Sequence, residues 1–178
     1  MAVRPRQFKG RLLTWQGLFG TFVLVSALSC GPNRPATSEV INVIEVIDGD
    51  TIRVDLGPNE EVVRLLGIDT PEATGGPRPV ECGGDEASEH TKRLLPPGTA
   101  VDLARDVETR DQYGRLLAFV VRVDDGLLVN QSLIESGHAT ALFFAPNTAQ
   151  KQAFERTETE ARVAGRGVWG GCEIEPSS

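Results

Sequence analysis

Acidic and basic side chains gather in two short segments of this chain. The first is Asp48-Gly49-Asp50, and the second runs from Arg64 to Glu72. Both adjoin apolar stretches typical of β-strands, where an unpaired carboxylate is costly. Carboxylates at strand ends indicate either a turn or a site for a hard metal ion. Asp-Gly alone is a common hairpin signal. A turn, however, requires neither Arg64 before a buried strand nor Glu72 just after a proline, so the two segments together favour a reactive site.

The residue types in these segments predict metal-assisted phosphodiester hydrolysis. Asp50 and Asp69 offer the oxygen ligands that Ca²⁺ or Mg²⁺ prefers, and no neighbouring histidine or thiolate argues for zinc or copper. Glu72 can reach the same site and is the predicted base that deprotonates an attacking water. Arg64 and Arg115 are the predicted phosphate contacts, because guanidinium groups donate in pairs and keep their charge. A metal ion and two arginines would stabilise the charge that develops on a phosphodiester in the transition state.

Several motifs follow one another in a fixed order. They are Asp-Gly-Asp-Thr at 48–51, Arg-x-x-x-x-Asp-Thr-Pro-Glu at 64–72, Asp-Gln-Tyr-Gly-Arg at 111–115 and Gly-Val-Trp at 167–169. In this order they resemble the staphylococcal nuclease-like (thermonuclease) family, and the similarity covers residues 40–172. The resemblance implies an α+β fold, a five-stranded OB-fold β-barrel with three helices. It further implies a monomer with one Ca²⁺ that cleaves DNA and RNA and leaves 3′-phosphates.

The resemblance also assigns a role to individual residues. The implied Ca²⁺ ligands are Asp50, Asp69 and the carbonyl of Thr70. The implied catalytic residues are Arg64 and Arg115, which contact the scissile phosphate, and Glu72, which activates the water. Asp48 and Tyr113 have supporting roles, Asp48 beside the metal and Tyr113 at the neighbouring phosphate.

One segment departs from the family pattern. Leu142-Phe143-Phe144-Ala145 lies where the best-known member carries tyrosines and a lysine that touch the substrate. Leu142 cannot stack on a base, and Ala145 supplies no charge. The segment is equally well explained as an apolar strand with Leu142 and one phenylalanine packed inward. The departure therefore concerns substrate binding and leaves the predicted chemistry unchanged.

A non-catalytic OB-fold module that binds nucleic acid or protein at the cell envelope is the alternative function. Such a module has no need to keep Asp50, Asp69, Arg64, Glu72 and Arg115 together. Their joint presence favours the enzyme.

The N-terminal segment predicts export. Residues 1–29 combine four basic residues with an apolar stretch from Leu12 to Leu28, the layout of a secretory signal peptide. Ala-Leu-Ser before Cys30 resembles a lipobox, so Cys30 is the expected lipidated residue of a membrane-anchored lipoprotein on the cell envelope. Free secretion and an uncleaved anchor are the alternatives. Residues 30–39 then form a flexible tether and residues 173–178 a C-terminal tail, on either side of the nuclease-like domain at 40–172.

The charge of the chain is unusual for a protein that binds polyanions. The net charge is −7, and removal of residues 1–29 with their four basic residues changes it to −11. Nucleic-acid-binding proteins usually carry a basic surface. The acidity predicts weak, salt-sensitive substrate binding and argues against a tight, non-catalytic nucleic-acid binder.

Two cysteines remain if Cys30 is acylated. Cys82 and Cys172 form an even pair in an exported chain, which predicts a disulfide between the loop after Glu72 and the end of the domain. Two free thiols are the alternative.

Apolar periodicity and turn residues predict the elements that position these residues. Strands are expected at 40–47, 51–56, 61–68, 99–104 and 116–123, with helices at 85–95, 130–136 and from 147 to about 164. Asn147, with Gln150 three residues later, predicts a capping box for the last helix. His90 is expected on a solvated helix face, and His138 is expected to be structural.

Overall fold

The computed structural model describes residues 40–76 and 78–172. The predicted signal peptide, Cys30, the tether and the C-terminal tail lie outside the described residues. No helix within the described ranges is both long and apolar enough to cross a membrane.

Five strands close into a barrel in the order β1-β2-β3-β6-β5. The strands are β1 (Ile41–Asp48), β2 (Thr51–Leu56), β3 (Asn59–Leu65), β5 (Ala100–Ala104) and β6 (Leu116–Arg122). All neighbouring pairs are antiparallel except β3 and β6, whose parallel register begins at Val63 and Leu116. A closed five-stranded barrel removes free sheet edges and is the architecture of an OB-fold. The predicted α+β fold is confirmed.

The third predicted strand, 61–68, is in fact two elements. Gly67 has φ 74°, and the chain turns there between β3 and a two-residue strand, β4 (Ile68–Asp69). A Cβ atom at Gly67 would overlap the ring of Phe143, so only glycine fits both the backbone conformation and the space. β4 pairs with β7 (Thr140–Ala141) outside the barrel, which brings Asp69 next to Thr140. The turn at Gly67 thereby directs Asp69 away from the barrel wall.

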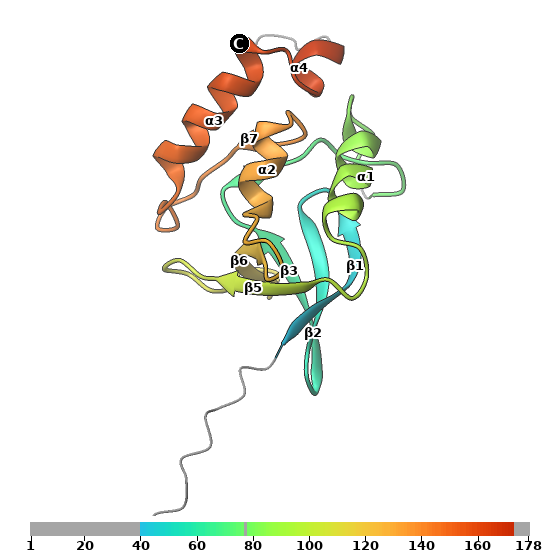
Figure 1. The fold of residues 1–178 in the computed structure, drawn as a ribbon, viewed down its shortest axis with the longest axis vertical. Coiled ribbons are helices and arrows are strands. Elements are labelled where there is room, and N and C mark those ends of the chain that lie inside the picture. Colours follow the sequence, from blue (N-terminus) through green and yellow to red (C-terminus); the bar gives the residue numbers. More distant parts are fainter. Residues whose placement is uncertain (1–39, 77, 173–178) are drawn as a thin grey trace, which may run out of the picture. The chain divides into compact units, whose positions relative to one another are not determined.

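Helices cover one end of the barrel, as Figure 1 shows. They are α1 (Gly84–Leu94), α2 (Val129–Glu135), α3 (Lys151–Val163) and the four-residue α4 (Val168–Gly171). α1 packs on β1, α2 lies between β6 and α3, and α3 contacts β7. Fully buried Phe154 of α3 meets Phe119 of β6 edge to face, with ring centroids 5.9 Å apart. Such pairs join the helical layer to the barrel core.

The predicted capping box at the start of α3 is wrong. Gln150 occupies the N-cap, and no side chain bonds there. Asn147 instead uses both ends of its amide on the backbone of Glu108, accepting from the N–H at 2.7 Å and donating to the carbonyl at 3.0 Å. A long-range pair of hydrogen bonds has therefore replaced the local cap.

The structure joins Cys82 and Cys172 in a disulfide across 90 residues, with a Cα–Cα distance of 5.9 Å, as the cysteine count predicted. Closing a loop of this length stabilises a protein by up to about 4 kcal/mol in the chain-entropy model. We expect a reducing agent to lower the melting temperature of the protein in calorimetry. The same scan on a Cys82→Ser/Cys172→Ser double variant is the control, and it should not respond to the reducing agent. An unchanged melting temperature of the wild-type protein on reduction would contradict this expectation.

The prediction that His90 lies on a solvated helix face is wrong. His90 is half-buried against His138, with ring centroids 4.4 Å apart. Burial is the main cause that lowers the pKa of His90 from 6.5 to about 4, and the neighbouring His138 and Arg93 lower it further. The pKa of His138 is also lowered, mainly by burial and next by Arg93, while the charge of Glu86 acts in the opposite direction. Both rings are therefore neutral in the folded protein at neutral pH.

This histidine pair should make the protein less stable in mild acid. Between the unfolded pKa of 6.5 and the folded pKa of about 4 for His90, the unfolded state binds more protons. The free energy of unfolding should therefore fall as the pH falls through that window. We expect the melting temperature to fall less between pH 7.5 and pH 5 in His90→Gln than in the wild type. Equal falls in the two proteins would show that His90 has no part in the effect.

Candidate active site

The turn between β1 and β2 carries two of the predicted acidic residues at the helix-covered end of the barrel. The N–H of Gly49 donates to the Asp48 carboxylate at 2.8 Å, and the Gly49 carbonyl accepts from the buried Thr91 hydroxyl of α1 at 2.7 Å. A Cβ atom at Gly49 would overlap the side chain of Thr70, so glycine permits this close approach. The turn is thereby fixed from both sides, and Asp50 is held at its end.

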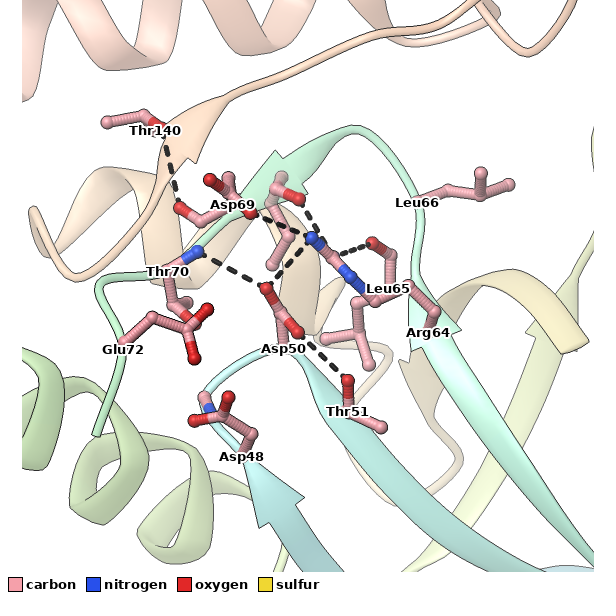
Figure 2. A network of polar contacts seen from close by, with 12 residues as sticks. Asp48, Asp50, Thr51, Arg64, Leu65, Leu66, Asp69, Thr70, Glu72 and Thr140 are labelled. Atoms are coloured by element: carbon pink, nitrogen blue, oxygen red, sulfur yellow. Dashed lines mark hydrogen bonds and ion pairs between the residues drawn. The ribbon is translucent and has the colours of Figure 1, made fainter. Parts of the chain in front are cut away.

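Arg64 joins the acidic residues of both sequence segments (Figure 2). Its Nη2 lies 2.9 Å from Asp50 Oδ2 and 2.9 Å from Asp69 Oδ1. Its Nη1 donates to the carbonyls of Leu65 at 2.9 Å and Ile68 at 2.8 Å. Three of the five guanidinium donors thus make hydrogen bonds within the protein, and the contact with Asp50 adds an ion pair. Arg64 holds the loop between β3 and β4 and the two carboxylates together, in addition to any contact with a phosphate.

The donor set around Asp50 and Asp69 fits a hard divalent cation. Both carboxylates contact a single nitrogen of Arg64. Burial raises the pKa of Asp69; the charge of Arg64 opposes this effect, and the charge of Asp50 adds to it. The hydroxyl of buried Thr70 has no hydrogen-bond partner among the described residues, whereas the backbone N–H of Thr70 donates to Asp50 Oδ2 at 3.3 Å. In residues 40–76 and 78–172, no three Asp, Glu, His or Cys side chains are grouped to hold a metal. A cation bound here would take its remaining ligands from carbonyl, water or substrate oxygens.

Glu72 lies directly beside this pair of carboxylates. Figure 2 shows the carboxylates of Glu72 and Asp48 next to Asp50, whose own oxygens are turned toward Arg64, Thr70 and Thr51. Glu72 is only 6 % exposed. Burial raises the pKa of Glu72, and Asp48, Asp50 and Glu81 act in the same direction, against the opposing charge of Arg78. A buried carboxylate with a raised pKa is a more effective proton acceptor at neutral pH than an exposed one.

Two residues without a predicted role support the site: Arg78 beside Glu72, and Asn130 beside the loop that follows Arg64. Arg78 forms an ion pair with the Glu72 carboxylate from the loop that follows it. Asn130, fully buried in α2, donates to the Leu66 carbonyl at 2.9 Å and accepts from the N–H of Val120 at 2.8 Å. Asn130 thus ties the loop that follows Arg64 to β6. Nothing local in the sequence marks these residues, because each acts on a partner from another segment.

Arg115 and Tyr113 lie on the loop before β6. The Nε of Arg115 donates to Asp111 Oδ2 at 2.7 Å, and its backbone N–H donates to Asp111 Oδ1 at 2.9 Å. Burial alone would raise the pKa of Asp111, but the hydrogen bonds from Arg115 outweigh it and lower that pKa. The guanidinium carbon lies 5.6 Å from the centre of the Tyr113 ring, and Tyr113 is 75 % exposed. Asp111 therefore orients Arg115, and no hydrogen bond to the described residues occupies its two Nη groups.

A groove of about 430 Å³ connects Arg64 with Arg115 and Tyr113. Leu142, Phe144 and Ala145 of the segment that departs from the family pattern also line this groove. Phe144 is 71 % exposed, whereas Phe143 packs on Phe154 with ring centroids 5.7 Å apart. One phenylalanine therefore points inward and the other outward, and Leu142 lines the groove. The groove is thus lined by two exposed aromatic rings, Tyr113 and Phe144.

The sequence profile of the family described as "Staphylococcal nuclease homologue" matches residues 62–171. The chain belongs to this family. Over 134 residues it is 37% identical to the thermonuclease of Staphylococcus hyicus, covering 75% of this chain and 78% of that protein. It is 37% identical over 143 residues to the thermonuclease of Staphylococcus intermedius, covering 78% and 83%. It is 35% identical over 130 residues to the SPbeta prophage-derived endonuclease YokF of Bacillus subtilis, covering 72% of this chain and 43% of that protein. This staphylococcal nuclease homologue thus combines the family's fold with the cluster of Asp50, Arg64, Asp69 and Glu72.

Proposed function

We propose that this member of the nuclease family hydrolyses the phosphodiester bonds of DNA and RNA with Ca²⁺ and leaves 3′-phosphate ends. The proposal is carried by one observation, the convergence of Asp50 and Asp69 on Arg64 beside the buried carboxylate of Glu72. Relatives named as thermonucleases and an endonuclease support the reaction class. Asp50, Asp69 and the carbonyl of Thr70 would hold the ion, with Asp48 in support. When bound there, Ca²⁺ supplies positive charge that polarises a phosphate oxygen.

Glu72 acts as the general base in this proposal. It takes a proton from water, and the water oxygen forms a bond to phosphorus while the bond from phosphorus to the 5′-oxygen breaks. The leaving 5′-oxygen takes up a proton from solvent, so the products are a 3′-phosphate and a 5′-hydroxyl. The raised pKa of Glu72, caused first by burial, favours the proton transfer.

Arg115 stabilises the developing charge on the phosphate. Asp111 holds its Nε at 2.7 Å, and the Nη groups, which make no hydrogen bond to the described residues, would donate to a phosphate oxygen. Arg64 would add a second positive charge, because its Nη2 lies 2.9 Å from Asp50 Oδ2 and 2.9 Å from Asp69 Oδ1, the carboxylates that would hold the ion. Tyr113, whose ring is exposed on the same loop, would hydrogen-bond the neighbouring phosphate through its hydroxyl. Preorganised donors of this kind lower the barrier without reorganising during the reaction.

The ends of the products test the proposed reaction. A 5′-labelled single-stranded DNA and an RNA of the same sequence are incubated with the protein and Ca²⁺. We expect shortened products whose mobility changes on treatment with a 3′-phosphatase. Products with free 3′-hydroxyls would contradict the direction of bond cleavage, and intact substrate would contradict the reaction itself.

The location of the enzyme is proposed from its sequence, since residues 1–39 lie outside the described residues. We propose an exported lipoprotein on the cell envelope, attached through Cys30. Cys30→Ala should abolish labelling of the protein by a radioactive fatty acid in a bacterial host, while wild type is labelled. Cys82→Ser is the matched control and should stay labelled. Label on the Cys30→Ala protein would contradict the lipobox.

A further inference from the structure

The backbone of Glu72 is held by the segment that closes the loop after it. The N–H of Glu72 donates to Glu81 Oε2 at 3.1 Å, and the Glu72 carbonyl accepts from the N–H of Glu81 at 2.9 Å. Both polar backbone groups of the proposed base therefore end on one residue. Glu81 is exposed, so these contacts depend on what holds Glu81 in place.

Two glycines bring the surrounding elements into contact at this point. A Cβ atom at Gly84, the first residue of α1, would overlap the Glu72 carbonyl group. A Cβ atom at Gly83 would overlap Val168 of α4 and lie 3.8 Å from Cys172 Sγ. Gly83 has φ 87°, which glycine adopts readily. The backbone of Glu72 is thus packed on the start of α1, which is packed in turn on the C-terminal segment.

The disulfide lies directly behind these contacts. Cys82 follows Glu81 in the chain, and its partner Cys172 follows α4. α4 is itself attached to the end of α2 by a hydrogen bond of 3.0 Å from the N–H of Val168 to the Gly137 carbonyl. Cys82 is exposed and therefore open to a reductant. Without the covalent bond, the close packing of Gly83 on Val168 would still join the end of this loop to the C-terminal segment, but no covalent link would hold it there.

We propose that Glu81 is a positioning residue for Glu72 and that the Cys82–Cys172 disulfide, by fixing Glu81, makes turnover depend on the redox state of the protein. We call Glu81, the disulfide and the two glycines the Glu72 clamp. The proposal rests on the proposed role of Glu72 as the base. A base that moves by about 1 Å from its productive position can lose up to roughly a hundredfold in rate. We therefore expect the clamp to act on turnover, because neither Glu72 nor Glu81 lines the groove between Arg64 and Arg115.

Reduction opens the clamp by ordinary thiol–disulfide exchange. A small dithiol supplies two electrons and two protons, and the bond between the sulfurs of Cys82 and Cys172 breaks. Each cysteine becomes a thiol, and the dithiol closes to its own cyclic disulfide. Removal of the dithiol and exposure to an oxidised disulfide reagent reverses the reaction.

The test compares the oxidised and reduced forms of the full protein below the melting temperature of the reduced form. We expect reduction to lower kcat by about tenfold to a hundredfold and to change KM by less than about twofold. Reoxidation should restore kcat. A Cys82→Ser/Cys172→Ser variant should resemble the reduced protein and ignore the dithiol. Unchanged kcat in reduced protein that is folded by circular dichroism would overturn the proposal.

Variants of Glu81 test the clamp with the disulfide intact. Glu81→Ala removes the acceptor for the N–H of Glu72 and should lower kcat, whereas Glu81→Gln keeps an acceptor and should restore most of it. Glu89→Ala is the matched control, because Glu89 is an exposed glutamate of α1 whose one ion pair with the described residues is to Lys92, at 2.8 Å. Equal kcat values in Glu81→Ala and Glu89→Ala would overturn the positioning role.

Hydrogen exchange separates this proposal from the proposed function. The amides of Glu72 and Glu81 should exchange at least about tenfold faster after reduction, while the amides of β2 keep their rates. If the oxidised protein cleaves nothing but its Glu72 and Glu81 amides still exchange faster after reduction, the nuclease mechanism is rejected and the clamp is supported. Normal cleavage with exchange and kcat both indifferent to reduction would reject the clamp and leave the nuclease mechanism standing.

Discussion

We expect Glu72→Gln to lower kcat by roughly 10²- to 10⁴-fold, the usual effect of removing a general base. An amide cannot take the proton of the attacking water. It retains the size of the side chain and an oxygen for Arg78, which pairs with the Glu72 carboxylate. The buried position should therefore remain filled, and the melting temperature should change by only a few degrees. Steady-state kinetics on a single-stranded DNA, with a thermal scan of each protein, measure both quantities.

The control for Glu72→Gln is Glu60→Gln, which removes the same charge from an exposed position of β3. This variant should retain the kcat of the wild type. A Glu72→Gln protein within tenfold of the wild-type kcat would contradict the assignment of the base. The result would then leave Asp48, whose carboxylate faces the same space, as the next residue to replace.

Arg115→Ala should lower kcat by about 10²- to 10³-fold, the magnitude found when one preorganised donor to a transition-state oxyanion is removed. Asp111 fixes the guanidinium through its Nε at 2.7 Å, so the alanine variant loses both charge and direction. Arg115→Lys should recover only part of the rate, because an ammonium group cannot bond Asp111 and donate a parallel pair to phosphate at once. Single-turnover cleavage of an oligonucleotide at saturating enzyme measures the effect on the chemical step.

Arg105→Ala is the control for Arg115→Ala, because Arg105 is an exposed arginine that follows β5 and does not line the groove. It should change binding only through the net charge, an effect that weakens with added salt. Equal loss of rate in both variants at moderate salt would show that Arg115 contributes only long-range charge.

The barrel was predictable from the sequence because its strands obey local rules. Alternating burial in β2 and the turn at Gly49 follow directly from apolar periodicity and from Asp-Gly. The break at Gly67 and the role of Asn147 were not predictable, because each depends on a partner distant in the chain, Phe143 in one case and Glu108 in the other. Local sequence signals therefore predict the strands and helices, whereas long-range contacts decide where some of them begin and end.

The candidate site divides in the same way. Asp50, Asp69 and Glu72 were singled out because carboxylates at strand ends need an explanation. Arg78 and Glu81 were not, since a charged residue in a loop rich in glycine and proline has no distinctive spacing. Only the fold brings Arg78 to the carboxylate of Glu72 and Glu81 to its backbone. Arg64 was expected at a phosphate, and the structure adds that it also binds the two aspartates.

The central claim is that Asp50, Asp69 and Glu72 together make a Ca²⁺-dependent nuclease. The most direct test is cleavage of single-stranded DNA and RNA by the purified protein, with Ca²⁺ and with a chelator, beside Glu72→Gln. The account predicts cleavage that requires Ca²⁺, stops with the chelator and is nearly lost in the variant. A folded protein that cleaves neither substrate at millimolar Ca²⁺, or that cleaves equally well with the chelator, would contradict it.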